Sequence, residues 1–104
     1  MANRTKTNPI YFDGFNADVT LASPGSSVVI TKIIMLSAAD GDIFRLEDAD
    51  GNRLVHMVNT GAADTVSEDF NNGLRCNNGV VIDVSDCTGM AATDGTDAVW
   101  IYLK

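Results

Sequence analysis

The sequence predicts an all-β chain: a single-domain antiparallel β-sandwich, jelly-roll-like, with about seven or eight short strands. Apolar residues recur at every second position, the period of a half-buried strand, and not at the helical period of 3.6. Each apolar segment is short, rich in β-branched residues and bounded by Gly, Asn, Asp or Pro. Strand candidates spaced by about ten residues are typical of a sandwich or small barrel. The 104 residues, 45% of them hydrophobic, suffice for one core.

Three strands are expected in the N-terminal part of the chain. Residues 9–12 form the first, with Pro9 at its start, where a proline leaves no ladder hydrogen bond unmade. Residues 18–22 alternate between apolar and polar side chains, and the Ser-Pro-Gly-Ser sequence at 23–26 is a turn signal. Residues 27–36 are apolar at nearly every position, so this strand is expected to be central or covered on both faces.

A β-hairpin over about residues 42–59 is the strongest local prediction. Asp50-Gly51 supplies the positive φ that a tight hairpin turn needs, and it separates two runs with strand periodicity, 42–48 and 53–58. Successive side chains of a strand point to opposite faces. The alternation therefore predicts two pairs of residues that share a face: Phe44 with Leu46, and Arg45 with Glu47.

The C-terminal part of the chain predicts weaker strands and one long loop. Residues 65–70 form a weak strand that Asn71-Asn72-Gly73 ends, and residues 74–76 are a connector. Residues 79–85 form a strand with inward side chains at Val80, Ile82 and Val84. Residues 86–97 are expected to be mostly loop, and residues 98–104 form a last strand that is apolar on both faces. No helix of two turns is expected.

The charge balance argues against two classes of binding protein. Seven Lys and Arg residues against 14 Asp and Glu residues give a net charge of −7, whereas nucleic-acid binding through a broad basic face needs clustered cations. No apolar run reaches the ~20 residues of a membrane-spanning helix. We therefore expect neither a nucleic-acid nor a membrane partner. All but two of the acids are Asp, a turn former, so the negative charge should lie at loop tips.

Residues 1–8 are expected to be a flexible basic N-terminal arm, and residues 9–104 the single β-sandwich domain. Arg4 and Lys6 are the only charged residues before Asp13. The arm has no large apolar side chain beyond Met1, so it cannot bury enough surface to order itself. Two interpretations remain: a frayed terminus, or an arm that becomes ordered against the acidic surface of a partner.

Residues that carry most enzyme chemistry are scarce. His56 is the only histidine and shares a strand face with Leu54 and Val58, which favours an apolar structural environment or a subunit contact over general-base chemistry. Cys76 and Cys87 flank one strand, so they form a disulfide only if the chain doubles back, and are otherwise two separate reduced thiols. The two cysteines do not have the spacing of a zinc site. We expect no enzyme activity and no cofactor.

Asp-rich segments raise the question of a bound cation. Residues 48–52, Asp-Ala-Asp-Gly-Asn, lack the Gly at the sixth position that an EF-hand loop needs. The Asp pairs within 40–42 and 94–97 are no more specific. Because Asp is a turn former, we expect turns and no metal site, with a weak cation site among converging loops as the alternative.

Two pairs of aromatic residues lie near opposite ends of the sequence. Tyr11 and Phe12 lie on the first predicted strand, and Trp100 and Tyr102 alternate on the last. They are core residues or, where exposed, anchors of an interface, because Trp and Tyr dominate the energy of many protein contacts.

The order of these segments resembles that of small β-sandwich virion proteins of tailed bacteriophages, which include capsid decoration (cement) proteins and head or tail accessory proteins. The similarity covers residues 27–104 and rests on five segments: VVITKIIMLSAADG, IFRLEDADGNRLVHMV, VSEDFNNGL, NNGVVIDVSD and AVWIYLK. It implies a sandwich or jelly roll without enzyme activity or cofactor. It also implies a homo-oligomer, with a trimer favoured, that is assembled in the host cytoplasm and located on the outer capsid surface of the virion.

The resulting hypothesis is a decoration protein that binds the outside of a phage head and bridges subunits of the major capsid protein. The candidate capsid-contact residues are Arg4, Lys6, Ile10, Tyr11 and Phe12, and the candidate oligomer-interface residues are Trp100 and Tyr102. The alternative is a tail or fibre accessory domain that binds a host glycan or receptor. A small enzyme would instead need a deep cleft with converging carboxylates.

Overall fold

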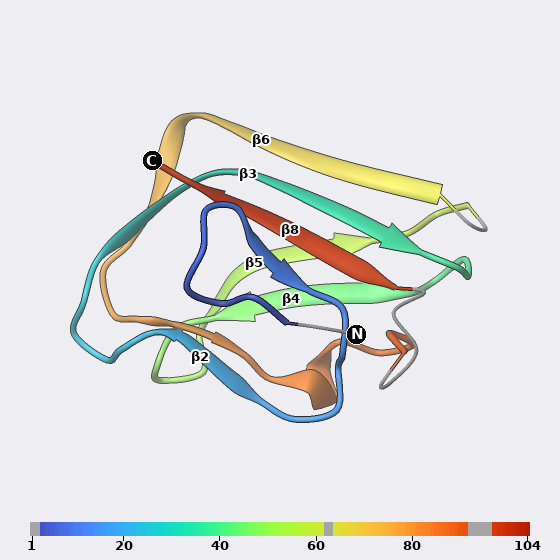
Figure 1. Ribbon diagram of the computed structural model, residues 1–104, viewed down its shortest axis with the longest axis horizontal. Coiled ribbons are helices and arrows are strands. Elements are labelled where there is room, and N and C mark those ends of the chain that lie inside the picture. The colour runs from blue at the N-terminus through green and yellow to red at the C-terminus, as the bar shows by residue number, and fades with distance from the viewer. Residues whose placement is uncertain (1–2, 62–63, 92–96) are drawn as a thin grey trace.

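The computed structural model describes residues 3–61, 64–91 and 97–104 (Figure 1). The strands within these ranges are β1 (Ile10–Phe12), β2 (Val19–Ala22), β3 (Val28–Ser37), β4 (Ile43–Glu47), β5 (Arg53–Val58), β6 (Asp64–Cys76), β7 (Val80–Ile82) and β8 (Ala98–Leu103). A 3₁₀ turn, η1 (Val84–Asp86), follows β7. No α-helix occurs in these ranges, and hence none that is long and apolar enough to span a membrane.

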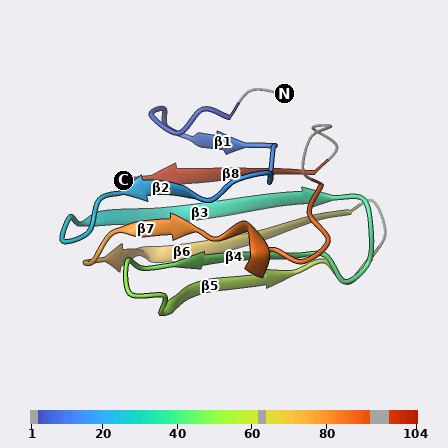
Figure 2. The same cartoon turned by 90° about the horizontal axis from the view of Figure 1, so that it is seen from below.

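The strands form two antiparallel sheets of four strands that pack as a β-sandwich (Figures 1 and 2). The first sheet has the order β1-β8-β3-β6, and the second has the order β2-β7-β4-β5. The chain therefore crosses between the sheets at nearly every connection and places its first strand beside its last. This order is that of a jelly roll. The predicted fold class is confirmed.

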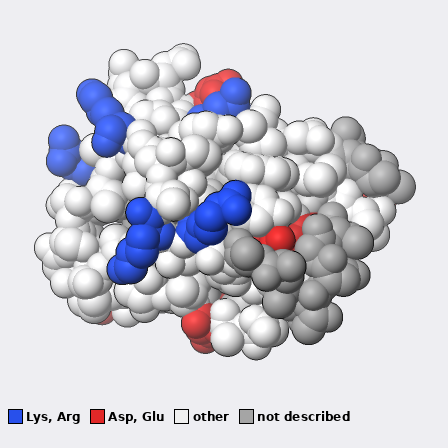
Figure 3. All heavy atoms as spheres, viewed as in Figure 1, with Lys and Arg blue, Asp and Glu red and all other residues white. Residues whose placement is uncertain are grey.

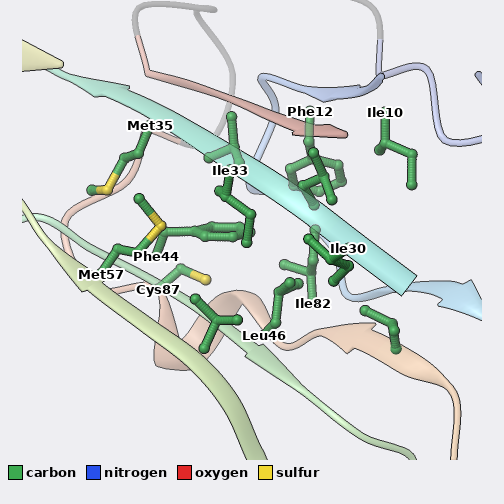
Figure 4. Close-up of a cluster of buried hydrophobic side chains, with 14 of the residues drawn as sticks. Ile10, Phe12, Ile30, Ile33, Met35, Phe44, Leu46, Met57, Ile82 and Cys87 are labelled. Atoms are coloured by element: carbon green, nitrogen blue, oxygen red, sulfur yellow. The ribbon is translucent and has the colours of Figure 1, made fainter. Parts of the chain in front are cut away.

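Apolar side chains from both sheets fill the space between them (Figure 4). Ile33 of β3 and Phe44 and Leu46 of β4 are fully buried. Phe15, in the connection after β1, meets Phe12 edge-on at 4.8 Å between ring centroids and Phe44 at 6.3 Å, so it links the two sheets. Burying a side chain of this size contributes about 1.5–3 kcal/mol, which makes this layer the main stabilising element.

The predicted hairpin is confirmed as β4 and β5, which pair antiparallel. Asp48 organises its turn: Oδ1 accepts hydrogen bonds from the backbone N–H groups of Asp50 and Asn52, both at 2.9 Å. These bonds, led by the one from Asn52, lower the pKa of the Asp48 carboxyl. Gly51 has φ +84°, as the turn requires. Here the Asp-rich segment therefore forms a turn, as expected.

The prediction that Asn71-Asn72-Gly73 ends a strand is wrong. β6 continues through this sequence to Cys76 and pairs with β3 on both sides of it. Ile30 pairs with Leu74 and Lys32 pairs with Asp69, so residues 70–73 have no register partner in β3 and form a four-residue bulge opposite Thr31. The strand continues past this turn sequence because its pairing with β3 resumes at Leu74.

The last predicted inward residue of strand 79–85 is also misplaced. Val80 and Ile82 are buried in β7, as predicted, but Val84 lies half-buried in the 3₁₀ turn η1. Asp83 caps this turn, because its Oδ1 accepts hydrogen bonds from the Ser85 backbone N–H at 3.1 Å and from Ser85 Oγ at 2.7 Å. A local side-chain bond thus replaces strand pairing after Ile82.

Asn59 ties the ends of β3 and β5 together from inside the protein. It is fully buried, and its Nδ2 donates to Ser37 Oγ at 2.6 Å and to the Ala39 carbonyl at 3.2 Å. Its Oδ1 accepts a hydrogen bond from the Gly61 N–H at 2.9 Å. The side chain therefore satisfies polar groups of two segments, the end of β3 with the residues after it and the residues after β5, at one end of the sandwich.

Candidate binding surface

A row of side chains crosses the outer face of the first sheet. Tyr11 pairs with Trp100 across β1 and β8, and Trp100 pairs with Ile34 across β8 and β3. The Tyr11 and Trp100 rings lie 5.3 Å apart and are tilted by 55°. The Arg4 guanidinium lies 4.7 Å from the centroid of the Tyr11 ring, within cation–π range. We call Arg4, Tyr11, Trp100 and Ile34 the aromatic row.

The N-terminal segment extends the first sheet beyond β1. Arg4 N–H donates to the Tyr11 carbonyl at 2.7 Å, and Tyr11 N–H donates to the Arg4 carbonyl at 2.9 Å. The Asn8 side-chain amide makes the pair of hydrogen bonds that a neighbouring strand would make with Leu103. It donates to the Leu103 carbonyl at 3.0 Å and accepts from the Leu103 N–H at 2.9 Å. Residues 3–8 thus lie against the sandwich, whereas their flexibility in solution stays a prediction.

The Tyr11 hydroxyl is fixed by the loop that follows β1. It donates a hydrogen bond to Asp13 Oδ2 at 2.9 Å. Burial raises the pKa of Tyr11, the bond and the negative charge of Asp13 raise it further, and the nearby Arg4 cation lowers it. Tyr11 therefore stays protonated, with its ring edge anchored and its face directed to Arg4.

The structure separates the predicted capsid-contact residues into two groups. Ile10 and Phe12 are 4% and 1% exposed and pack in the core, so their assignment as surface contacts is wrong. Alternation along β1 explains this, because it directs these two side chains inward and Tyr11 outward. Arg4 and Lys6 are exposed.

The predicted capsid-contact residue Tyr11 and the predicted oligomer-interface residues lie on one surface. Trp100 and Tyr102, predicted to pack against other subunits, are half-buried on the same face as Tyr11. Tyr102 pairs with Lys32 of β3, which extends the face toward β6. Sequence reasoning placed the two aromatic pairs apart because it did not predict that β1 pairs with β8.

Most of the basic residues of the chain lie in or beside the first sheet. In the view of Figure 1, which shows strands of both sheets, several Lys and Arg side chains and few Asp or Glu atoms are visible (Figure 3). Five of the seven basic residues lie in or beside this sheet, namely Arg4, Lys6, Lys32, Arg75 and Lys104. Acidic residues dominate the strands and turns of the second sheet: Asp18, Asp40, Asp42, Glu47, Asp48, Asp50, Asp83 and Asp86. Five acidic residues, Asp13, Asp64, Glu68, Asp69 and Asp97, also lie in or beside the first sheet and balance its five basic residues. The excess negative charge of the chain therefore belongs mainly to the second sheet.

A carboxylate cluster beside β4 was not predicted. Glu47, Asp83 and Asp86 each bring an oxygen within 4.8 Å of the others. Glu47 is buried where β4 bulges after Leu46, and this burial, with a hydrogen bond to Asp86, raises its pKa. Arg45 Nε lies 2.8 Å from Glu47 Oε2 yet makes no hydrogen bond. Carboxylate oxygens suit hard cations, and here Arg45 already supplies a positive charge.

The remaining candidate residues lie away from this face. His56 shares the outer face of β5 with Leu54 and Val58, as predicted, but it is exposed there and not enclosed by apolar neighbours. Cys76 and Cys87 are both free and buried, which corresponds to the second of the two alternatives left open. Burial raises the pKa of the Cys87 thiol to about 11, so it is no nucleophile at neutral pH.

A small apolar pocket opens between the sheets, with a volume of about 20 Å³. This space accommodates about one water molecule. It is lined by Ile10, Leu21, Ala22, Val28, Ile30, Val80, Ile101 and Leu103. The pocket therefore has neither the size nor the polar groups of a substrate site.

The chain was also compared with known proteins. No protein-family model, no curated protein and no solved structure matches it.

Proposed function

We propose that the protein is a structural virion protein: a capsid decoration (cement) protein that binds the outer surface of a phage head and bridges neighbouring subunits of the major capsid protein. The observation that carries the proposal is the aromatic row. It joins the basic N-terminal segment to the aromatic C-terminal strand in one outward surface, with Arg4 over Tyr11 and Tyr11 against Trp100.

The composition of this surface suits protein docking. Trp, Tyr and Arg are the residues that most often dominate the energy of an interface, especially at its centre. Arg4 in the aromatic row and Lys6 near it in sequence are exposed cations. Lys32 pairs with Tyr102, and its Nζ lies 4.0 Å from Asp69 Oδ1. The partner that we propose for this surface is therefore an acidic protein surface that faces Arg4 and Lys6. When the first sheet is docked, the acidic second sheet faces solvent. Stabilisation of the shell then comes from area buried at many equivalent contacts.

The fold is compatible with this role but does not decide it. Jelly rolls occur in viral capsid domains and in lectins, and unrelated functions share one fold. The alternative, a tail or fibre domain that binds a host glycan or receptor, would use the same outward aromatic side chains. The partner distinguishes the two functions: a phage capsid in one case and a host surface in the other.

A pair of matched charge reversals tests the proposal. Lys6→Glu changes an exposed cation beside the first sheet, and Arg53→Glu makes the same change on the second. Binding of each purified variant to undecorated capsids is measured by co-sedimentation. We expect Lys6→Glu to weaken binding about tenfold, equivalent to about 1.4 kcal/mol, because a favourable contact becomes repulsive. Arg53→Glu should leave binding unchanged.

Other outcomes overturn the proposal. Equal loss of binding in both variants would mean that the attraction is not specific to the first sheet. Absence of capsid binding by the wild-type chain, together with binding to host cells, would support the tail or fibre function instead.

The trimeric state is a separate proposal. Contacts around a threefold axis are heterologous, so each chain of a trimer would present two different surfaces to its neighbours. Light scattering at two protein concentrations measures the mass of the assembly. Three times the chain mass of 11.0 kDa at both concentrations would support a trimer, and the mass of one chain would exclude a stable one.

A further inference from the structure

We propose that Asn72 is a site of spontaneous deamidation and that Asn78 is protected from the same reaction. These two residues begin the only Asn-Gly sequences of the chain, Asn72-Gly73 and Asn78-Gly79. The fold gives the two identical dipeptides different surroundings, so the chain carries its own control.

The reaction needs no partner other than water. The backbone nitrogen of the glycine loses its proton and attacks Cγ of the asparagine side chain, and Nδ2 leaves as ammonia. Water then opens the resulting cyclic imide at one of its two carbonyls and leaves aspartate or isoaspartate. Glycine favours ring closure because it has no Cβ to hinder the approach and its backbone is the least restricted.

Asn72 lies outside the regular ladder between β6 and β3. It belongs to the bulge of residues 70–73, which has no partner in β3. Its side chain is exposed and makes no hydrogen bond within the described part of the chain. The Asn72 side chain is therefore open to solvent at the edge of the first sheet, and the half-buried Gly73 that supplies the attacking nitrogen also lies outside the regular pairing.

Asn78 is held by hydrogen bonds on every group that the reaction uses. Its Oδ1 accepts from the Gly25 N–H at 3.1 Å, and its Nδ2 donates to Asp50 Oδ2 at 3.0 Å. The attacking nitrogen, that of Gly79, donates to the Ser26 carbonyl at 3.1 Å. All three bonds must break before the ring can close, so the reaction requires local opening of the fold.

The product at Asn72 changes the surface more than the fold. A new carboxylate joins Glu68 and Asp69 on β6 and adds one negative charge to the edge of the first sheet. Isoaspartate lengthens the backbone, but it does so in a bulge that already departs from the β3 register.

The test follows both sites in the same sample of the full chain. The folded protein is aged in a mildly alkaline buffer made with ¹⁸O water and then digested with trypsin. Cleavage after Arg75 places the two asparagines in different peptides, whose gain of acid and ¹⁸O is followed by mass spectrometry. We expect Asn72 to react at least about tenfold faster than Asn78, a ratio that needs only about 1.4 kcal/mol of extra barrier. Equal rates, or a faster Asn78, would overturn the proposal.

Two further measurements distinguish the effect of the folded structure on the deamidation rates from the effect of the local sequence. In denaturant the two sites should react at similar rates, because both dipeptides are then exposed. Asp50→Ala removes the acceptor of Asn78 Nδ2, so this variant should accelerate Asn78 and leave Asn72 unchanged. A difference that persists in denaturant, or an unchanged Asn78 rate in Asp50→Ala, would show that the hydrogen bonds are not the cause.

Discussion

Replacing Asn59 by alanine should destabilise the protein more than any change of an exposed polar residue. Asn59 is fully buried, and its amide makes three well-placed hydrogen bonds, to Ser37 Oγ, the Ala39 carbonyl and the Gly61 N–H. Alanine makes none of them and leaves the buried Ser37 hydroxyl without this partner.

The size of the effect follows from those contacts. Three hydrogen bonds at about 1 kcal/mol each give a loss of about 3 kcal/mol in the free energy of unfolding. For a domain of about 100 residues, this loss lowers Tm by about 12 °C or more. Urea unfolding followed by circular dichroism measures the free energy, and a thermal scan measures Tm.

Asn71→Ala is the matched control, because Asn71 is exposed in the β6 bulge. Its unfolding free energy should stay within about 0.5 kcal/mol of the wild type. If Asn59→Ala lost less than about 1 kcal/mol relative to Asn71→Ala, the reasoning that this buried amide network stabilises the end of the sandwich would be refuted.

Two further predictions concern a backbone constraint and a buried carboxyl. Gly73 and Gly51 both have positive φ, but a Cβ at Gly73 would also meet Val29, so Gly73→Ala should lose about 1–3 kcal/mol more than Gly51→Ala in urea unfolding. Equal losses would contradict this. Burial raises the pKa of Glu47, so its contribution to stability is present below about pH 4 and is lost as the pH rises through the folded-state pKa. Glu47→Gln should therefore lose less stability between about pH 4 and pH 7 than the wild type, whereas the exposed Glu68→Gln should keep the wild-type slope.

The strands that the sequence predicted well are those whose signal is local. The β4–β5 hairpin combines a turn dipeptide with alternation on both sides, so neighbouring residues suffice to define it. The β6 bulge has the opposite origin. Asn71-Asn72-Gly73 is a local turn signal, but the long-range pairing of β6 with β3 overrides it. The neighbouring sequence does not indicate that pairing.

The binding surface depends on pairing between distant segments. Asn8 meets Leu103 across almost the whole chain, and Tyr11 meets Trp100, so the N-terminal segment is held by contacts that its own composition does not encode. The aromatic and basic residues were therefore predicted individually, whereas their union into one surface required the β1–β8 pairing.

The orientation of the protein on a capsid is the most direct test of the proposed function. Electron cryomicroscopy of decorated shells would show which sheet faces the major capsid protein. The proposal predicts density that places the aromatic row, with Tyr11 and Trp100 at its centre, against the shell and the acidic β4–β5 turn toward solvent. Contact through the second sheet, or shells that stay bare at saturating protein concentration, would contradict it.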